Sequence, residues 1–70
     1  MRLHYYPETD SLYIDLNEVP GVETRQIVEG LLADFDSGGN VVGLDIEHAS
    51  VKLDLSKIET ISLPSTHAAA

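Results

Sequence analysis

Apolar and polar residues alternate along most of this chain, in runs separated by short turn sequences. In residues 2–16, RLHYYPETDSLYIDL, apolar side chains recur at every second position on both sides of PETD. Because successive side chains of a strand point to opposite faces, this period of two predicts two strands joined in a hairpin. Pairing Tyr6 with Ser11 sets Leu3 opposite Ile14 and gathers the apolar residues on one face.

The other face of this hairpin is polar and aromatic. The same register sets Arg2 opposite Asp15 and His4 opposite Tyr13. Tyrosine and arginine are enriched at binding hot spots, but such cross-strand pairs also stabilise an exposed sheet face. Both interpretations stay open. The residues that would form this interaction surface are Arg2, His4, Tyr6, Tyr13 and Asp15.

Residues 22–36, VETRQIVEGLLADFD, predict two more strands that meet at Glu29 and Gly30. Apolar alternation on both sides of this pair supports a second hairpin. Pairing Val28 with Leu31 brings Arg25 opposite Asp34, and we expect these two to form a structural cross-strand pair.

A third hairpin is predicted in ADFDSGGNVVGLD, residues 33–45. Gly38 and Gly39 suit a two-residue loop, because both central residues of that turn need positive φ. Asn40 then begins the next strand, and Phe35 faces Val42. Gly38, Gly39 and Asn40 are therefore expected to be a structural turn.

The same stretch has a second interpretation as a calcium loop. Counting from Asp34, acidic residues stand first, third and twelfth, and Gly39 stands sixth. A calcium loop of the helix–loop–helix type has a similar spacing. However, Gly38 stands fifth, the twelfth residue is Asp where Glu is usual, and both flanks alternate like strands. A tight hairpin cannot also wrap an ion, so we expect no metal site.

After Glu47 the pattern weakens. Val51, Leu53 and Leu55 have strand spacing, whereas Leu55 and Ile58 fit one helical turn with Asp54 as its N-cap, so helix and strand both stay open for residues 50–63. We favour a short helix between Ser50 and Glu59, laid across the apolar face. The predicted fold is α+β, mainly β: an antiparallel β-meander of four to five strands built from hairpins, with this C-terminal helix. Residues 1–63 would form a single small domain and residues 64–70 a disordered tail.

The amino-acid composition limits the classes of partner that the chain can bind. Twelve acidic residues against four basic ones give a net charge of −8, which repels phosphate backbones and argues against nucleic acid. That charge suits a basic protein partner, or serves solubility alone. The chain has no cysteine and no apolar run typical of a signal peptide or a membrane span. We therefore expect a cytoplasmic protein without membrane contact.

The short length of the chain predicts that it associates with itself. A chain of 70 residues buries a modest core, and folds of this length often need a disulfide, a metal or a partner subunit. Open sheet edges and an apolar face that one short segment does not cover favour a homo-oligomer. A two-fold dimer is the simplest closed form.

Two stretches resemble a known family. RLHYYPETDSLYIDL is similar to the pattern R-x-x-Y-x-P-x-x-D-x-L-Y-I, and EGLLADFDSGGNVVGLDIEHAS to G-x-x-x-D-x-D-x-x-G-x-V-V-G-x-x-I-x-x-A-S. Both patterns are typical of small bacterial and archaeal proteins in the domain-of-unknown-function family 2283. The resemblance implies a compact β-sheet domain and no assigned activity. A location of members beside small toxins would imply an antitoxin-like role.

Two function classes remain. The first is a non-catalytic protein-interaction module, antitoxin-like, that binds a basic protein partner. The second is a small hydrolase or a ligand- or cation-binding protein that uses Asp34, Asp36 and His48. The sequence has no Ser-His-Asp order, phosphate-binding glycine loop or paired metal-ligating histidines, which favours the first class. We therefore expect no enzyme activity, no catalytic residue and no cofactor.

Overall fold

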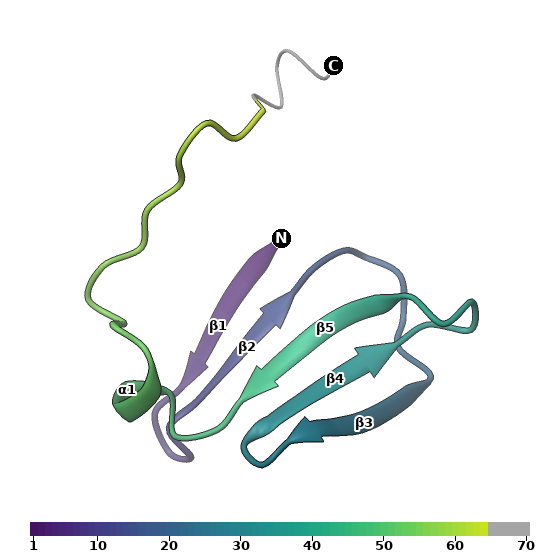
Figure 1. Ribbon diagram of the computed structural model, residues 1–70, viewed down its shortest axis with the longest axis horizontal. Coiled ribbons are helices and arrows are strands. Elements are labelled where there is room, and N and C mark those ends of the chain that lie inside the picture. Colours follow the sequence, from purple (N-terminus) through teal and green to yellow (C-terminus); the bar gives the residue numbers. More distant parts are fainter. Residues whose placement is uncertain (65–70) are drawn as a thin grey trace.

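The chain folds into one antiparallel sheet followed by one short helix (Figure 1). This computed structural model describes residues 1–64, so the predicted disordered tail lies outside the described residues except for Pro64. The elements in chain order are β1 (Arg2–Tyr6), β2 (Ser11–Asp15), β3 (Glu23–Val28), β4 (Leu31–Phe35), β5 (Val41–Ile46) and α1 (Ala49–Lys52). The predicted α+β, mainly β class is confirmed.

The strand order differs from a simple meander. The sheet runs β1-β2-β5-β4-β3, so β2 lies beside β5 and not beside β3. The physical reason is the composition of β3, whose residues ETRQIV are mostly polar and exposed. Such a strand suits an edge, where charged residues also block pairing with other chains. The more apolar β5 instead takes the central place, with Leu44 beside Ile14 and Ile46 beside Leu12.

The predicted register of the first hairpin is confirmed at all five pairs. Arg2 lies opposite Asp15, His4 opposite Tyr13, and Tyr6 opposite Ser11. A shift by one residue would turn every apolar side chain of β2 to the polar face, which is why alternation fixes this register so firmly.

The predicted Arg25–Asp34 pair is wrong. Val28 lies opposite Leu31 as expected, but a β-bulge between Gln26 and Val28 shifts the rest of the strand. Arg25 therefore lies opposite Ala33, on the apolar face. Its Nε atom is 3.1 Å from Oε2 of Glu23, and its guanidinium lies 3.9 Å from the centre of the Phe35 ring.

Between β4 and β5, Asp36 and Asn40 close a loop of three residues, 37–39, where a loop of two was predicted. The Asp36 amide donates to the Asn40 carbonyl at 2.9 Å, and the Gly39 amide donates to the Asp36 carbonyl at 3.1 Å. Among the residues of this loop, only Gly39 has positive φ, at 82°, as in a turn followed by a left-handed residue. The Asp36 carboxylate favours this loop because it accepts bonds from the amides of Gly38 and Asn40, at 2.9 and 2.8 Å.

The pairing of β4 with β5 is irregular next to this loop. The pairs from Leu31 opposite Ile46 to Asp34 opposite Gly43 are as predicted, but Phe35 lies opposite Val41 and not Val42. Val42 is buried, and a β-carbon built on Gly21 would lie 3.6 Å from its Cγ2 atom. Val42 therefore packs near the β2–β3 loop instead of facing Phe35.

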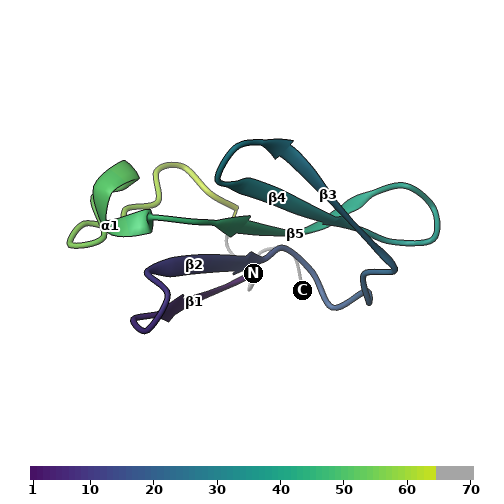
Figure 2. The ribbon, with the colours of Figure 1, turned by 90° about the horizontal axis from the view of Figure 1, so that it is seen from below.

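The helix covers less of the sheet than predicted. It has four residues, begins after His48 and lies at the end of the sheet beside the β1–β2 turn (Figures 1 and 2). Its main neighbour is β2, and Ala49 is fully buried. Residues 53–64 have no regular structure, and Ile58 and Ile61 are 72% and 75% exposed. The buried apolar residues of the described chain are Leu12, Ala33, Val42 and Ala49.

Candidate binding face

One face of the sheet carries most of the polar side chains. The registers align residues into rows across the strands. Two rows lie on this face: Arg2–Asp15–Gly43–Asp34–Thr24 and His4–Tyr13–Asp45–Leu32–Gln26. Four members of the predicted interaction surface therefore extend into a larger polar face that includes residues of β4 and β5.

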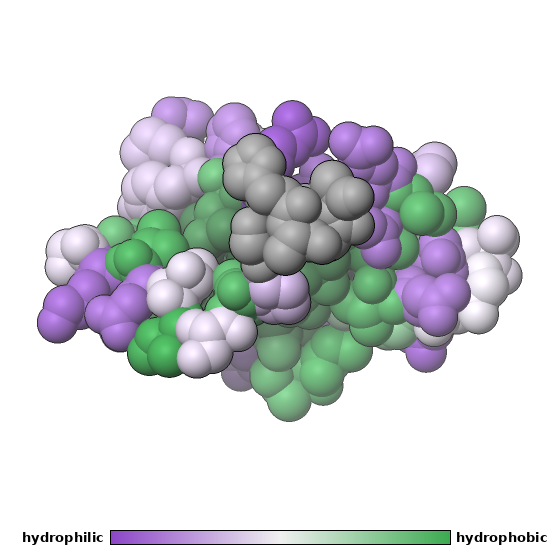
Figure 3. All heavy atoms as spheres, turned by 90° about the horizontal axis from the view of Figure 1, so that it is seen from above, coloured by the Kyte–Doolittle hydropathy of each residue, from purple (hydrophilic) through white to green (hydrophobic). Residues whose placement is uncertain are grey.

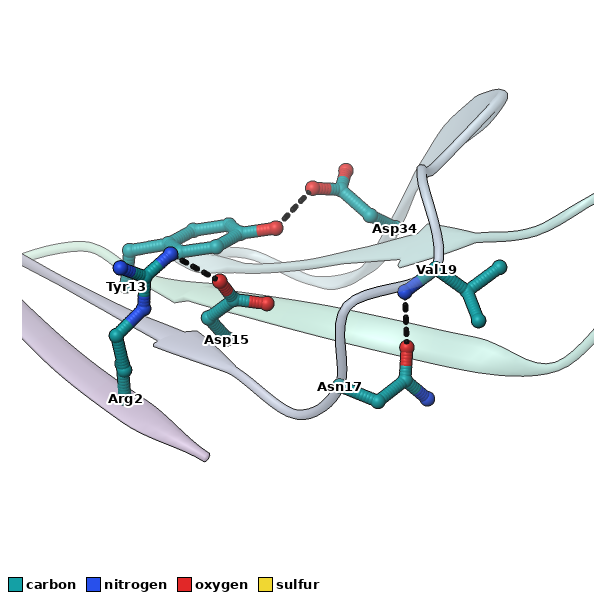
Figure 4. Close-up of polar contacts among 6 residues, drawn as sticks. All are labelled: Arg2, Tyr13, Asp15, Asn17, Val19 and Asp34. Atoms are coloured by element: carbon teal, nitrogen blue, oxygen red, sulfur yellow. Dashed lines mark hydrogen bonds and ion pairs between the residues drawn. The ribbon is translucent and has the colours of Figure 1, made fainter.

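The Arg2–Asp15 pair lies at the outer edge of this face. Nη2 of Arg2 is 3.2 Å from Oδ2 of Asp15, as Figure 4 shows. The Arg2 side chain is 85% exposed, so the pair adds little to stability and its guanidinium stays open to solvent. Beside it, in the β2–β3 loop, Oδ1 of Asn17 accepts from the Val19 amide at 2.9 Å.

Tyr13 crosses the sheet from β2 to β4. Its hydroxyl donates to Oδ2 of Asp34 at 2.6 Å (Figure 4). The Thr24 hydroxyl donates to Oδ1 of the same carboxylate at 2.6 Å. The ring passes over Gly43, where a β-carbon would lie 2.6 Å from Cζ of Tyr13. The hydrogen bond to the Asp34 carboxylate raises the pKa of Tyr13 to about 12. The Asp34 carboxylate therefore joins side chains from β2 and β3 to β4.

We expect Tyr13 to titrate about two pH units later than a free tyrosine. Its folded-state pKa of about 12 lies above the unfolded value near 10, so its stabilising contribution is complete below pH 10 and lost as pH rises toward 12. Carbon-13 NMR of the tyrosine Cζ signals during an alkaline titration measures this pKa. Asp34→Asn should lower it, and Thr24→Val should keep it raised. A wild-type Tyr13 pKa near 10 would contradict the assigned hydrogen bond.

An open pocket of about 590 Å³ lies on the polar face near the β1–β2 turn. Its lining combines two aromatic rings, two hydroxyls, an imidazole and two carboxylates: Tyr6, Tyr13, Thr9, Ser11, His48, Asp45 and Glu47. The sequence pointed to Tyr6, Tyr13 and His48, and the calcium-loop interpretation included Asp45 as its twelfth residue, but Glu47 was missed. The alternation had placed Asp45 on the face opposite the apolar residues, which was the available signal.

Asp45 is the most unusual group in this pocket. Its Oδ1 atom is buried and has no hydrogen-bond partner among the described residues. Burial raises the pKa of this carboxyl, and the negative charges of Glu47 and Asp34 add to the effect. A buried acceptor without a donor is costly, so this pocket favours a ligand that carries an N–H donor or a positive charge.

Flat aromatic surface adjoins the pocket. The rings of His4 and Tyr6 stack with their centres 4.1 Å apart and their planes at 21°. Both side chains come from the edge strand β1 and are exposed. Such a stacked pair offers a rigid platform for an aromatic or guanidinium group.

Asp10 ties the pocket to the helix. Its carboxylate accepts from the Tyr5 hydroxyl at 2.7 Å and from the hydroxyl and amide of Ser50 at 2.7 and 3.1 Å. Its carbonyl accepts from the Ala49 amide at 2.8 Å. The bond from Tyr5, with those from Ser50, lowers the pKa of Asp10. This network joins residues 2–16 to residues 29–50, the two stretches with the family patterns. It thereby places His48 at the pocket.

The residues of the alternative function, a small hydrolase or a ligand- or cation-binding protein, make separate contacts in the structure. Asp34 accepts from Tyr13 and Thr24, while Asp36 holds the β4–β5 loop. His48 precedes the helix in a left-handed conformation with φ of 55°. No hydrogen bond or ion pair joins these three within residues 1–64. The same range contains no group of three His, Cys, Asp or Glu placed to hold a metal ion.

Comparison with known proteins gives one match. A family model described as "Protein of unknown function (DUF2283)" matches residues 2–50, which include β1 to β5 and both stretches noted in the sequence. Neither the curated proteins nor the solved structures contain a match. Across residues 1–64, no helix has the length and apolar character needed to cross a membrane.

Proposed function

The chain belongs to the DUF2283 family, and from its polar face we propose that it is a non-catalytic protein-interaction module that receives a basic segment of a partner protein. One observation carries this proposal: the buried, unpaired Oδ1 atom of Asp45 in a pocket lined by tyrosines and Glu47. A lysine or arginine side chain supplies the missing donor and the balancing charge.

Charge and aromatic content support a basic partner. The net charge of −8 attracts cationic segments at long range and speeds their encounter. Tyr6 and Tyr13 provide ring faces next to the carboxylates, and an arginine guanidinium binds such faces as well as carboxylates. An antitoxin that masks a small basic partner is the specific form of this function that we propose.

A non-catalytic role fits the state of the acidic side chains. Asp34 and Asp36 are engaged by hydrogen bonds that stabilise the sheet and its loop, so neither is poised to move a proton. The absence of cysteine suits a reducing compartment, and we propose that the protein acts in the cytoplasm.

Calorimetric titration with an arginine-rich peptide tests the proposal. We expect binding at low salt that weakens as salt rises, and no binding of a peptide in which glutamine replaces arginine. Asp45→Asn should weaken the affinity about tenfold or more, because a hydrogen bond to a charged group contributes about 1.5–3 kcal/mol.

Glu59→Gln is the matched control, because it removes the same charge from an exposed residue outside the sheet. It should leave the affinity within about twofold of wild type, since exposed charges are largely screened. Equal weakening by both variants would mean that general electrostatics, and not the pocket, attracts the peptide. No heat signal with wild type would reject the proposal.

A further inference from the structure

The face opposite the polar face is almost entirely apolar. The registers align two rows across all five strands, Leu3–Ile14–Leu44–Ala33–Arg25 and Tyr5–Leu12–Ile46–Leu31–Val28. Phe35 and Val41 continue this apolar face toward the β4–β5 loop. In Figure 3 apolar residues gather along the lower side of the molecule, and hydrophilic residues lie along the upper side and at both ends.

The described chain buries Leu12 and Ala33 at the centre of this face but leaves much of the rest exposed. Leu3, Tyr5 and Val28 are 45%, 40% and 59% exposed. The helix reaches only the end of the sheet near β2, and Figure 2 shows the strands forming one twisted layer. Stable domains bury a sheet face against a second layer, because one layer encloses no core. The apolar face therefore needs a second layer of protein that buries its exposed side chains.

We infer that two copies of this chain pack their apolar faces together and form a two-layer β-sandwich. A standard interface buries about 800 Å² on each partner. On the apolar face Leu3, Tyr5, Val28 and Val41 are at least 40% exposed, and a two-fold contact through this face would bury their exposed parts.

The balanced charges on the apolar face favour a second copy of the chain as the partner at this face. Its charged strand residues are Glu23 and Arg25, which pair with each other at 3.1 Å beside Phe35. The face therefore carries no net charge, and two copies can meet there without opposing like charges, although each chain carries −8 overall. A basic partner would find its complement on the polar face, which stays exposed in the sandwich. The inference is thus independent of the proposed partner.

Sedimentation equilibrium at low and moderate salt tests this inference. We expect a mass of twice the 7.6 kDa chain, with tighter association at moderate salt because the overall repulsion is screened. The urea midpoint should also rise with protein concentration, since dimer stability depends on mass action. A single-chain mass at both salts, with a midpoint independent of concentration, would overturn it.

Substitutions on the two faces of β1 and β3 would show which face forms the dimer interface. Leu3→Glu and Val28→Glu should weaken dimerisation about a hundredfold, because each dimer would bury two unpaired carboxylates. His4→Glu and Gln26→Glu are the matched controls on the same strands but the opposite face, and both should remain dimeric. If a variant unfolds instead, the concentration dependence of the wild-type midpoint still decides. A dimer that survives both apolar-face substitutions would place the contact at the sheet edges and reject the sandwich.

Discussion

Gly43→Ala is expected to destabilise the protein by about 3 kcal/mol, because overpacking and a lost hydrogen bond to a charged group act together. The added methyl group would occupy the space of the Tyr13 ring, with Cζ only 2.6 Å away. Tyr13 would have to leave its place and would lose its bond to Asp34. Urea unfolding of the variant and wild type measures the difference.

Removing the obstructing ring gives the control. In a Tyr13→Ala background, Gly43→Ala should be neutral or stabilising by about 0.5–1 kcal/mol, because alanine orders a strand at lower entropic cost than glycine. The double-mutant cycle thus separates the steric effect from strand propensity. A Gly43→Ala loss that persists without the Tyr13 ring would mean that the glycine serves another purpose.

Leu12→Ala is expected to cost about 2–5 kcal/mol, since it removes a large buried side chain and leaves a cavity. Leu12 is 6% exposed and lies in the inner strand β2, between Tyr5 and Ile46. Small proteins are stable by only about 5–15 kcal/mol, so the variant should be largely unfolded at modest denaturant concentrations. Thermal unfolding followed by circular dichroism measures this loss.

Leu63→Ala removes the same atoms from a residue that is 65% exposed. Its effect should stay within about 0.5 kcal/mol, because exposed substitutions away from special contacts rarely matter more. Equal losses in the two variants would show that residues 53–64 pack more tightly than their exposure indicates.

Alternation predicted the local parts of this fold well. The register of β1 with β2 and four of the pairs between β4 and β5 follow from keeping apolar residues on one face. A wrong register there would bury charges and expose leucines, so the sequence leaves few alternatives. The class of fold followed from the same signal.

The non-local parts could not be derived in this way. Hairpin patterns describe neighbours in the sequence, but β2 pairs with β5 across the β3–β4 hairpin. The bulge at Ile27 was equally hidden, because one extra residue in a polar edge strand changes no apolar match on the other strands. The predicted Arg25–Asp34 pair failed for this reason.

For the same reason, the sequence could predict only part of the candidate site. Tyr13 and Asp45 lie opposite each other only because β2 and β5 are neighbours. The bond from Tyr13 to Asp34 needs the same arrangement, with Gly43 between them. Residues from one hairpin could thus be recognised in the sequence, whereas the pocket that they form with β5 required the strand order.

The strand order also determines how the chain can reach its folded state. Tight turns close β1–β2 and β3–β4–β5 as two local units, and hairpins of this kind form in about 1–10 μs. The β2–β5 contact joins residues as distant as Leu12 and Ile46, and it carries a larger loop-closure entropy. We therefore expect the docking of the two units to limit the folding rate, with the Asp10–Ser50 bonds closing after it. The centre of the finished sheet is then the last part of it to form.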